Sequence, residues 1–400
     1  MKDSYNIRKI FTNMELDLIK SLNRNLKNHD DSQAKENIKF EQWQSAKLRD
    51  LERFRRENQE IVGRYSPAVE ELIEFTLVDT YKKAQLASNE FIKEIKINSQ
   101  KFEVSLPGEL EKIKKPIDAS NLEDMYRQIM ENISNYQNAP TPLEGNFFKM
   151  NDKKFNVLIE SVQSDMDDAL YSVLRRTEDI YRQTIYKSQV YFNTGTYSIN
   201  QSIDLATKDF LAKGIDSVTY KDGSRVNISS YAEMALRTAN HRAYLMSEGK
   251  TRENIGNPLV IVSAHATACK LCIPWQAQIL IDDVFTNIET DGLLFPKLSE
   301  AIEKGLLHPN CRHNLSTYFP GITSIPKLPT NEKEILRNYQ SEQKQRYIER
   351  QIRKYKRLYN GSIDEKNKNY YREKVLEWQD KMRNHININS QLRRNYYREK

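Results

Sequence analysis

The sequence predicts a predominantly helical α+β protein with long N-terminal helices, a small α+β central domain holding a zinc-type Cys/His cluster, and a helical, basic C-terminal arm. Three observations favour this fold class. Glycine and proline number only 12 each among 400 residues, below the usual shares of about 7% and 5%, so turns are scarce and an all-β fold is excluded. Apolar residues recur at three- and four-residue steps over long stretches. All three cysteines lie within residues 269–311.

The composition indicates a water-soluble protein. Hydrophobic residues make up 38% of the chain and charged residues 29%, and the mean hydropathy is −0.76. No stretch approaches the roughly 18 consecutive apolar residues of a membrane-spanning helix, and the first residues lack the apolar segment of a secretory signal. We therefore expect neither a membrane protein nor an exported one. Three cysteines cannot form a disulfide framework, which favours a reducing compartment.

Residues 1–142 form the first predicted region, made of long helices. Its apolar stripes include Leu16, Ile19, Leu22 and Leu26, then Leu48, Leu51 and Phe54, then Leu72, Ile73, Val78 and Tyr81. Because proline kinks a helix interior, we expect Pro67 to open the third helix near its first turn. The Pro-containing stretch 138–142 predicts a boundary. Stripes of this kind indicate core or helix-partner surface, and we assign no chemistry to them.

The central region, residues 143–325, begins with the strongest periodic signal in the chain. An apolar stripe runs through residues 151–190 without Pro or Gly, so one helix there would be about 60 Å long at 1.5 Å per residue. We next expect a helix at 202–213, ended by Gly214. A hairpin at 218–226 follows, since Asp-Gly suits its turn.

The second half of the central region is predicted as helix followed by strand. Ser230 and Glu233 have capping-box spacing, so we expect a helix from there to about Met246, stopped by Gly249. Residues 258–263 are rich in β-branched side chains, which is typical of a short buried strand.

The cysteines and histidines of the central region have the spacing of a zinc site. Cys269 and Cys272 form a C-x2-C, and His308, Cys311 and His313 form an H-x2-C-x-H some forty residues later. Zn²⁺ takes four such ligands, two from each of two short segments. The predicted quartet is Cys269, Cys272, His308 and Cys311, with His313 or His265 as alternates for His308.

Other interpretations of this cluster stay open. Free cysteines are often small buried hydrophobes, and C-x2-C is also a redox motif, although no thioredoxin-like βαβ pattern surrounds it. Four protein ligands favour a structural site, whereas three with a water favour a catalytic one. Asp282, Asp283 and Glu289 are the nearby carboxylates that a catalytic site could use as a base, but their spacing matches no motif. We favour a structural zinc.

The C-terminal arm, residues 326–400, carries the positive charge of the chain. Residues 331–400 hold 19 Lys and Arg against 10 Asp and Glu, a net of +9, whereas the whole chain nets +7. Such a concentration favours a polyanionic partner, although interleaved acids are equally typical of a solvated helix face. The candidate nucleic-acid contacts are Arg346, Arg350, Arg353, Lys354, Lys356, Arg357, Arg393 and Arg394. The tyrosines among them predict helix packing rather than base stacking.

Several longer segments resemble the phage minor capsid protein 2 family. They are SAHA at 263–266, PWQ at 274–276, NCRH at 310–313, YFPG at 318–321, and the segments 220–226, 230–238, 342–354 and 391–400. The resemblance spans roughly residues 150–400, and the N-terminal third is similar only in being helical. Members of that family have residues other than cysteine at the positions of Cys269 and Cys272. They also have no histidine at the position of His308. In those two places the chain is similar to Mu-type phage head-morphogenesis proteins, which have C-x2-C and His-Pro-Asn-Cys-Arg.

The resemblance implies a structural virion protein of a tailed bacteriophage. It makes residues 143–325 a minor-capsid or head-morphogenesis domain and places the protein inside the head near the portal, after assembly in the host cytoplasm. The implied partners are the portal protein, the major capsid or scaffolding protein, and phage DNA through the C-terminal arm. The sequence contains no G-x-S-x-G, P-loop or G-x-G-x-x-G, so we expect no enzyme. The alternative is a zinc-organised nuclease of the treble-clef kind, or another nucleic-acid-processing enzyme, with His265 or His313 as its catalytic residue.

Overall fold

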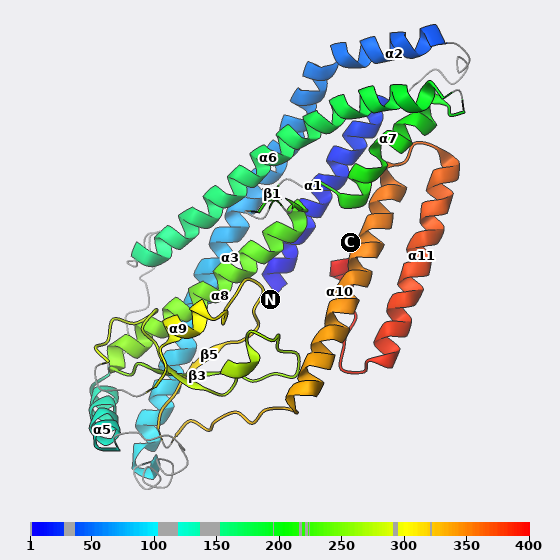
Figure 1. The fold of residues 1–400 in the computed structure, drawn as a ribbon. Helices are drawn as coiled ribbons and strands as arrows, with labels where there is room; N and C mark the ends of the chain where they lie inside the picture. Colours follow the sequence, from blue (N-terminus) through cyan, green and yellow to red (C-terminus); the bar gives the residue numbers. More distant parts are fainter. Residues whose placement is uncertain are drawn as a thin grey trace. The chain divides into compact units, whose positions relative to one another are not determined.

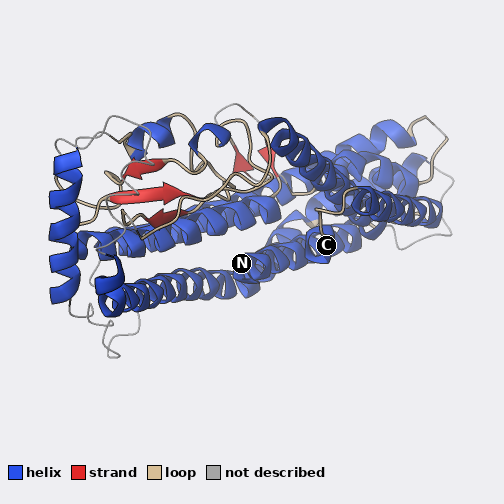
Figure 2. Cartoon of the chain, turned by 90° about the horizontal axis from the view of Figure 1, so that it is seen from below, coloured by secondary structure: helices blue, strands red, loops and turns tan. Residues whose placement is uncertain are grey.

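The chain is mostly helical with small antiparallel sheets, which confirms the predicted fold class (Figures 1 and 2). The structure is a computed structural model that describes residues 2–27, 37–102, 119–136, 153–194, 196–215, 218–220, 223, 225–290, 295–320 and 322–400. In these ranges no helix is long and apolar enough to cross a bilayer. The boundary predicted at 138–142 lies outside the described residues.

The chain folds into two compact units. Unit 1 comprises Met1–Ile73, Ser161–Leu236 and Ser341–Lys400, and unit 2 comprises Glu74–Glu160 and Arg237–Gln340. The helices are α1 (Lys2–Leu26), α2 (Asn37–Arg49), α3 (Leu51–Phe102), α5 (Ala119–Asn135), α6 (Lys153–Phe192), α7 (Ile199–Lys213), α8 (Ile228–Ile255), α9 (Leu298–Glu303), α10 (Glu332–Gly361), α11 (Glu365–Ile388) and the short η2 (Ile273–Trp275) and η3 (Tyr396–Glu399). The strands are β1 (Val218–Thr219), β2 (Arg225–Val226), β3 (Leu259–Val262), β4 (Ile279–Ile281) and β5 (Leu315–Thr317). The division predicted from the sequence, at residues 142 and 325, stays a prediction.

Apolar side chains from five helices form the main core of unit 1. Leu22, Trp43, Phe54, Tyr181 and Ile203 represent α1, α2, α3, α6 and α7 in it, and all are buried. The Phe54 and Tyr181 rings stack at 4.2 Å between centroids. The long helix predicted over 151–190 is present as α6, and the predicted hairpin pairs β1 with β2. The 3.6-residue apolar period located α1 and α6 correctly, whereas the stripe at Leu48, Leu51 and Phe54 crosses the break between α2 and α3 at Asp50.

The expectation that Pro67 opens a helix is wrong, because α3 runs through it from Leu51 to Phe102. A proline in a helix interior lacks one hydrogen bond and crowds the carbonyl four residues earlier, which belongs here to Gly63. Val69 and Ile73 are buried two and six residues later. Their burial, like that of Phe54 before the proline, favours continuing the helix over breaking it.

The C-terminal arm is helical, as predicted, and its last residues pack into unit 1. The Arg398 guanidinium lies 3.5 Å from Glu233 of α8 and 3.7 Å from Glu349 of α10. Glu233 also accepts a hydrogen bond from Arg8 of α1, and all of these carboxylates are buried. The C-terminal segment thus shares one ion network with α1, α8 and α10.

The limits predicted for the helix at 230–246 are wrong at both ends. Helix α8 begins at Ile228 and passes through Gly249 to Ile255. Ser230 is not the N-cap, because it lies inside α8, and the Glu233 carboxylate is engaged by Arg8 and Arg398. Gly249 is required for packing instead, since a Cβ there would lie 2.3 Å from the Phe285 carbonyl oxygen.

Replacing Gly249 by Ala is expected to destabilise unit 2 by about 1–3 kcal/mol, because overpacking outweighs the helix propensity that alanine adds. Urea denaturation followed by circular dichroism measures this change. The matched control is Gly63→Ala in α3, where a Cβ meets nothing within 4 Å. We expect that substitution to be neutral or to stabilise by up to about 1 kcal/mol. Equal effects at the two glycines would contradict the packing argument.

Unit 2 is built around a three-stranded antiparallel sheet in the order β4-β3-β5. The central strand β3 is the one predicted at 258–263, and Val260 in it pairs with Leu280 of β4 and Thr317 of β5. One face packs with Leu245 of α8, Leu298 of α9 and the loops that carry the cysteines. The sheet thereby fixes where these loops begin and end.

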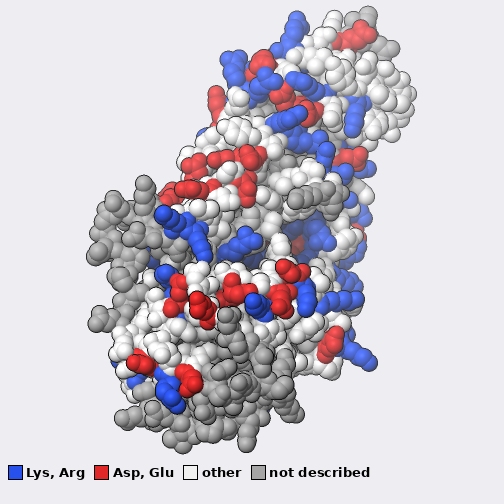
Figure 3. Space-filling view, turned by 60° about the vertical axis from the view of Figure 1, so that its left-hand side comes forward, with Lys and Arg blue, Asp and Glu red and all other residues white. Residues whose placement is uncertain are grey.

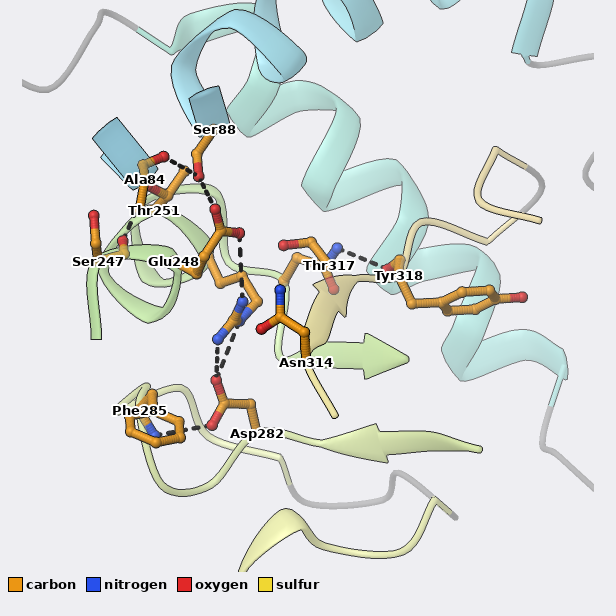
Figure 4. Close-up of polar contacts among 12 residues, drawn as sticks. Ala84, Ser88, Ser247, Glu248, Thr251, Asp282, Phe285, Asn314, Thr317 and Tyr318 are labelled. Atoms are coloured by element: carbon orange, nitrogen blue, oxygen red, sulfur yellow. Dashed lines mark hydrogen bonds and ion pairs between the residues drawn. The ribbon is translucent and has the colours of Figure 1, made fainter. Parts of the chain in front are cut away.

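A buried ion network joins the end of β4 to α8 (Figure 4). The Arg252 Nε and Nη2 atoms donate to the same carboxylate oxygen of Asp282 at 3.1 and 2.6 Å, and neither side chain is exposed. The other Asp282 oxygen accepts from the Phe285 N–H at 2.9 Å. Glu248 lies 3.9 Å from Arg252 and accepts from the Ser88 hydroxyl of α3. The network is fully inside unit 2, where a charge without its partner is costly.

Candidate metal centre

The C-x2-C segment forms a tight turn between β3 and β4. The N–H groups of Cys272 and Ile273 both donate to the Cys269 carbonyl oxygen at 3.1 Å, and the 3₁₀ helix η2 follows directly. The N–H groups of Leu271 and Cys272 in this turn help to lower the pKa of Cys269. Amide hydrogen bonds stabilise a thiolate, which is the form that binds metal.

The second segment lies in a strained loop between α9 and β5. Leu307 and Asn310 have φ angles of 56° and 66°, a region that non-glycine residues seldom occupy. The Cys311 N–H donates to the His308 carbonyl oxygen at 2.8 Å, which closes the loop. Cys311 also receives the His313 N–H at its sulphur. In this loop conformation His308 lies against Cys269 and Cys311 against Cys272.

The two segments bring their sulphur and nitrogen atoms together. The Cys272 and Cys311 sulphurs are 3.7 Å apart, Cys269 Sγ lies 3.2 Å from His308 Nε2, and Cys311 Sγ lies 3.5 Å from His313 Nδ1. With Zn–S bonds of about 2.3 Å and Zn–N bonds of about 2.0–2.1 Å, a tetrahedral site has S···S edges of about 3.7 Å and S···N edges of about 3.5 Å. The distances are therefore close to those of a tetrahedral site.

The ligand atoms fall into two groups that share Cys272. Cys269, Cys272 and His308 form one, and Cys272, Cys311 and His313 form the other, with all atoms of a group within 4.8 Å of one another. Among the described residues no four such atoms meet this spacing together. The cluster can hold a metal ion, and Cys272 lies where both groups meet.

The protonation of the cysteines suits metal binding. The pKa of Cys311 falls to about 3, because its thiolate accepts a hydrogen bond from the Cys272 thiol and, against the effect of burial, from His313. The same shared proton, with burial, raises the pKa of Cys272. Burial opposes ionisation of Cys269, but hydrogen bonds from backbone N–H groups and His308 outweigh it and lower its pKa. Two of the three sulphurs thus favour the thiolate form.

A hydrogen bond at one ring nitrogen of His308 orients the other ring nitrogen toward the cluster. His308 Nδ1 donates to the Pro309 carbonyl oxygen at 2.8 Å, which directs Nε2 at Cys269. The proton between Nε2 and that sulphur is the one that a metal ion would replace. The alternate His265 packs its ring 4.1 Å from that of His313. His313 is buried, and its Nε2 has no hydrogen-bond partner in the described part of the chain.

The carboxylates considered as a catalytic base are placed differently. Asp282 is fully buried and paired with Arg252, so it is not available to a substrate. Asp283 accepts from the Ser299 N–H and hydroxyl at the start of α9. Glu289 is exposed. No local sequence pattern indicates the buried cationic partner of Asp282, because Arg252 lies thirty residues earlier.

The candidate nucleic-acid contacts of the C-terminal arm differ in their surroundings. Arg353 donates to the Arg398 carbonyl oxygen, and Arg357 donates to the carbonyl oxygens of Leu211 and Ala212 at 3.0 and 2.9 Å. Arg346 pairs with Glu342 and Arg394 with Glu399, each at 2.7 Å or less. Arg350 and Arg393 are exposed, and Lys354 and Lys356 are half-buried. Their contact with nucleic acid stays a prediction.

Comparisons with known proteins give the following matches. A family model described as phage minor capsid protein 2 matches residues 3–144 and 140–387, so the similarity includes the N-terminal third. A structural protein of Lactococcus phage LL-H is 27% identical over 230 residues, covering 55% of this chain and 61% of that protein. A structural protein of Lactococcus phage mv4 is 36% identical over 103 residues, covering 24% of this chain and 80% of that protein. No solved structure matches the chain.

Proposed function

This chain belongs to the phage minor capsid protein 2 family, and from that premise we propose that it acts inside a tailed-phage head, beside the portal. There it contacts the portal protein, the packaged DNA or both, and it meets the major capsid or scaffolding protein during assembly in the host cytoplasm. The observation that carries this proposal is the family match over nearly the whole chain. Long helices such as α3 and α6 suit it, because they offer extended surfaces to neighbouring subunits.

We further propose that the Cys/His cluster holds one structural Zn²⁺. Cys269, Cys272 and Cys311 would bind it with His308, and His313 or His265 are the alternates for the fourth position. When bound, zinc would cross-link the two loops that flank the sheet of unit 2. The two alternate histidines contact each other, because the His313 ring packs against the His265 ring. His313 also directs its Nδ1 atom at the Cys311 sulphur. This surrounding of soft ligands supports a structural role over the nuclease alternative.

We expect heads purified from the phage that encodes this chain to contain it in few copies and in a protected location. Quantitative mass spectrometry relative to the portal and major capsid proteins measures its abundance. Protease treatment before and after the heads are opened measures its location, because an intact shell excludes the protease. Cross-linking is expected to join it to the portal protein.

The portal protein itself is the control for protease access, since its buried part should be protected to the same degree. A chain absent from purified heads would refute the structural role. A chain that is present but digested in intact heads would refute the interior location.

A further inference from the structure

Seven cationic side chains line one groove in unit 1. The groove has a volume of about 760 Å³ and lies between α6, the end of α7, β2, the start of α8 and α10. Arg176, Lys213 and Arg225 come from outside the C-terminal arm and join four cations of α10. None of the described residues lining it is Asp or Glu. On the face drawn in Figure 3, charges of both signs are present.

The four α10 cations lie on one face of that helix. Arg350, Arg353, Lys354 and Arg357 have the i, i+3, i+4 and i+7 spacing of helix neighbours. Like charges four residues apart destabilise a helix by about 0.2–0.5 kcal/mol per pair. Burial and the nearby Arg8, Arg357 and Arg398 lower the pKa of Arg353, although Glu349 opposes this. A face of this kind indicates an anionic partner that offsets the repulsion.

The cationic side chains of the groove fall into two groups, those that hydrogen-bond to the protein backbone and those that are exposed or half-buried without a carboxylate partner. Arg353 and Arg357 donate to backbone carbonyl oxygens and form part of the structure of unit 1. Lys213 and Arg350 are exposed, and Lys354 is half-buried. Within the described ranges these three side chains form no ion pair with a carboxylate. Arg350 and Lys354 lie over the Tyr347 and Tyr355 rings, 5.9 and 5.3 Å from the centroids, and these contacts leave their charges without a counter-ion.

We propose that this groove binds the phosphate backbone of double-stranded DNA, with Lys213, Arg350 and Lys354 as contacts. The choice of DNA over an acidic protein rests on the proposed function. Five of the seven cations are arginine, whose planar guanidinium suits phosphate oxygens. The start of α8, with Asn227 and Ser230 in the groove lining, adds the positive end of a helix dipole. The contact surface thereby includes residues of α7 and α8 as well as the C-terminal arm.

Binding of the full chain to a fluorescein-labelled 30-base-pair duplex tests this proposal, measured by anisotropy over a series of NaCl concentrations. The variant Lys213→Ala/Lys354→Ala should reduce the slope of log K against log salt by about 2, since each phosphate contact contributes about 0.9. The affinity at about 0.1 M salt should fall at least tenfold by the same relation. Lys213→Arg/Lys354→Arg should retain binding, because it keeps both charges.

The matched control is Lys344→Ala/Lys366→Ala, which removes the same charge from two exposed lysines outside the groove lining. It should change the affinity less than about threefold. Circular dichroism and thermal melting check that every variant is folded. An equal loss of affinity in groove and control variants would overturn the proposal, as would a wild type that does not bind. Polyglutamate that competes as well as DNA would assign the groove to an acidic protein instead.

Failure of this proposal is distinguishable from failure of the proposed function. A chain that is protected inside heads but does not bind DNA refutes only the groove. A chain that binds DNA through the groove but is absent from heads refutes the head location and leaves the groove intact.

Discussion

Replacing Cys272 by Ser is expected to abolish metal binding and to lower the melting temperature of unit 2 by roughly 10 °C or more, given about 2–4 °C per kcal/mol for a unit of this size. Cys272 belongs to both ligand groups, and its sulphur is 3.7 Å from that of Cys311. Its loss therefore removes a ligand from any quartet that the cluster can form. A structural zinc site contributes its binding free energy to folding, so several kcal/mol are at stake. Elemental analysis of the purified chain should find about one Zn per wild-type chain and none in the variant.

A chelator provides the control for this prediction. Stripping the wild type with a chelator should reproduce the melting temperature of the Cys272→Ser variant, and the variant itself should not respond to the chelator. Cysteines that act only as packed hydrophobes predict another result. The wild type would then be free of metal, and the chelator would leave its melting unchanged.

The second large effect is expected from Asp282→Asn, which should destabilise unit 2 by about 3–5 kcal/mol. The substitution keeps the size of the side chain but leaves the Arg252 guanidinium buried without its counter-ion. Glu248 compensates little, because its carboxylate is 3.9 Å from Arg252 and also accepts from Ser88. The free energy of unfolding from urea titration measures the loss.

Glu289→Gln is the matched control, because it removes one negative charge from an exposed carboxylate in the same segment of the chain. We expect it to change stability by less than about 0.5 kcal/mol. The double variant Arg252→Met/Asp282→Leu should recover much of the loss, since an apolar pair of similar volume can replace a buried ion pair. If Asp282→Asn and Glu289→Gln had the same effect, the buried pair would not be a main support of unit 2.

The features of the fold that depend on local sequence patterns could be predicted from the sequence. The apolar period of 151–190 predicted α6, and the β-branched run at 258–263 predicted β3. The spacing of the cysteines and histidines predicted that two distant segments would meet, and the sulphurs of Cys272 and Cys311 do approach each other. Their role as metal ligands stays a proposal, because spacing specifies which atoms can meet and not what they bind.

Features that depend on tertiary contacts were beyond sequence reasoning. Pro67 and Gly249 are helix breakers by local preference, yet α3 and α8 continue through them because packing on both sides outweighs that preference. The groove collects cations such as Arg176 and Arg350, which are far apart in the chain. The Arg252–Asp282 pair had no local signal for the same reason.

The arrangement of unit 1 also has a consequence for biosynthesis. Its ion network includes Arg8, Glu233 and Arg398, so α1 reaches its final surroundings only after residue 398 has been made. At about 5–20 residues per second, a ribosome needs roughly 20–80 s to pass from Arg8 to Arg398. During much of that interval Ile19 of α1 lacks its eventual neighbours Leu358 and Tyr371, although Leu22 can already pack with helices made earlier. The last step in the folding of unit 1 therefore waits until residue 398 has left the ribosome, and chaperone binding to α1 is expected until then.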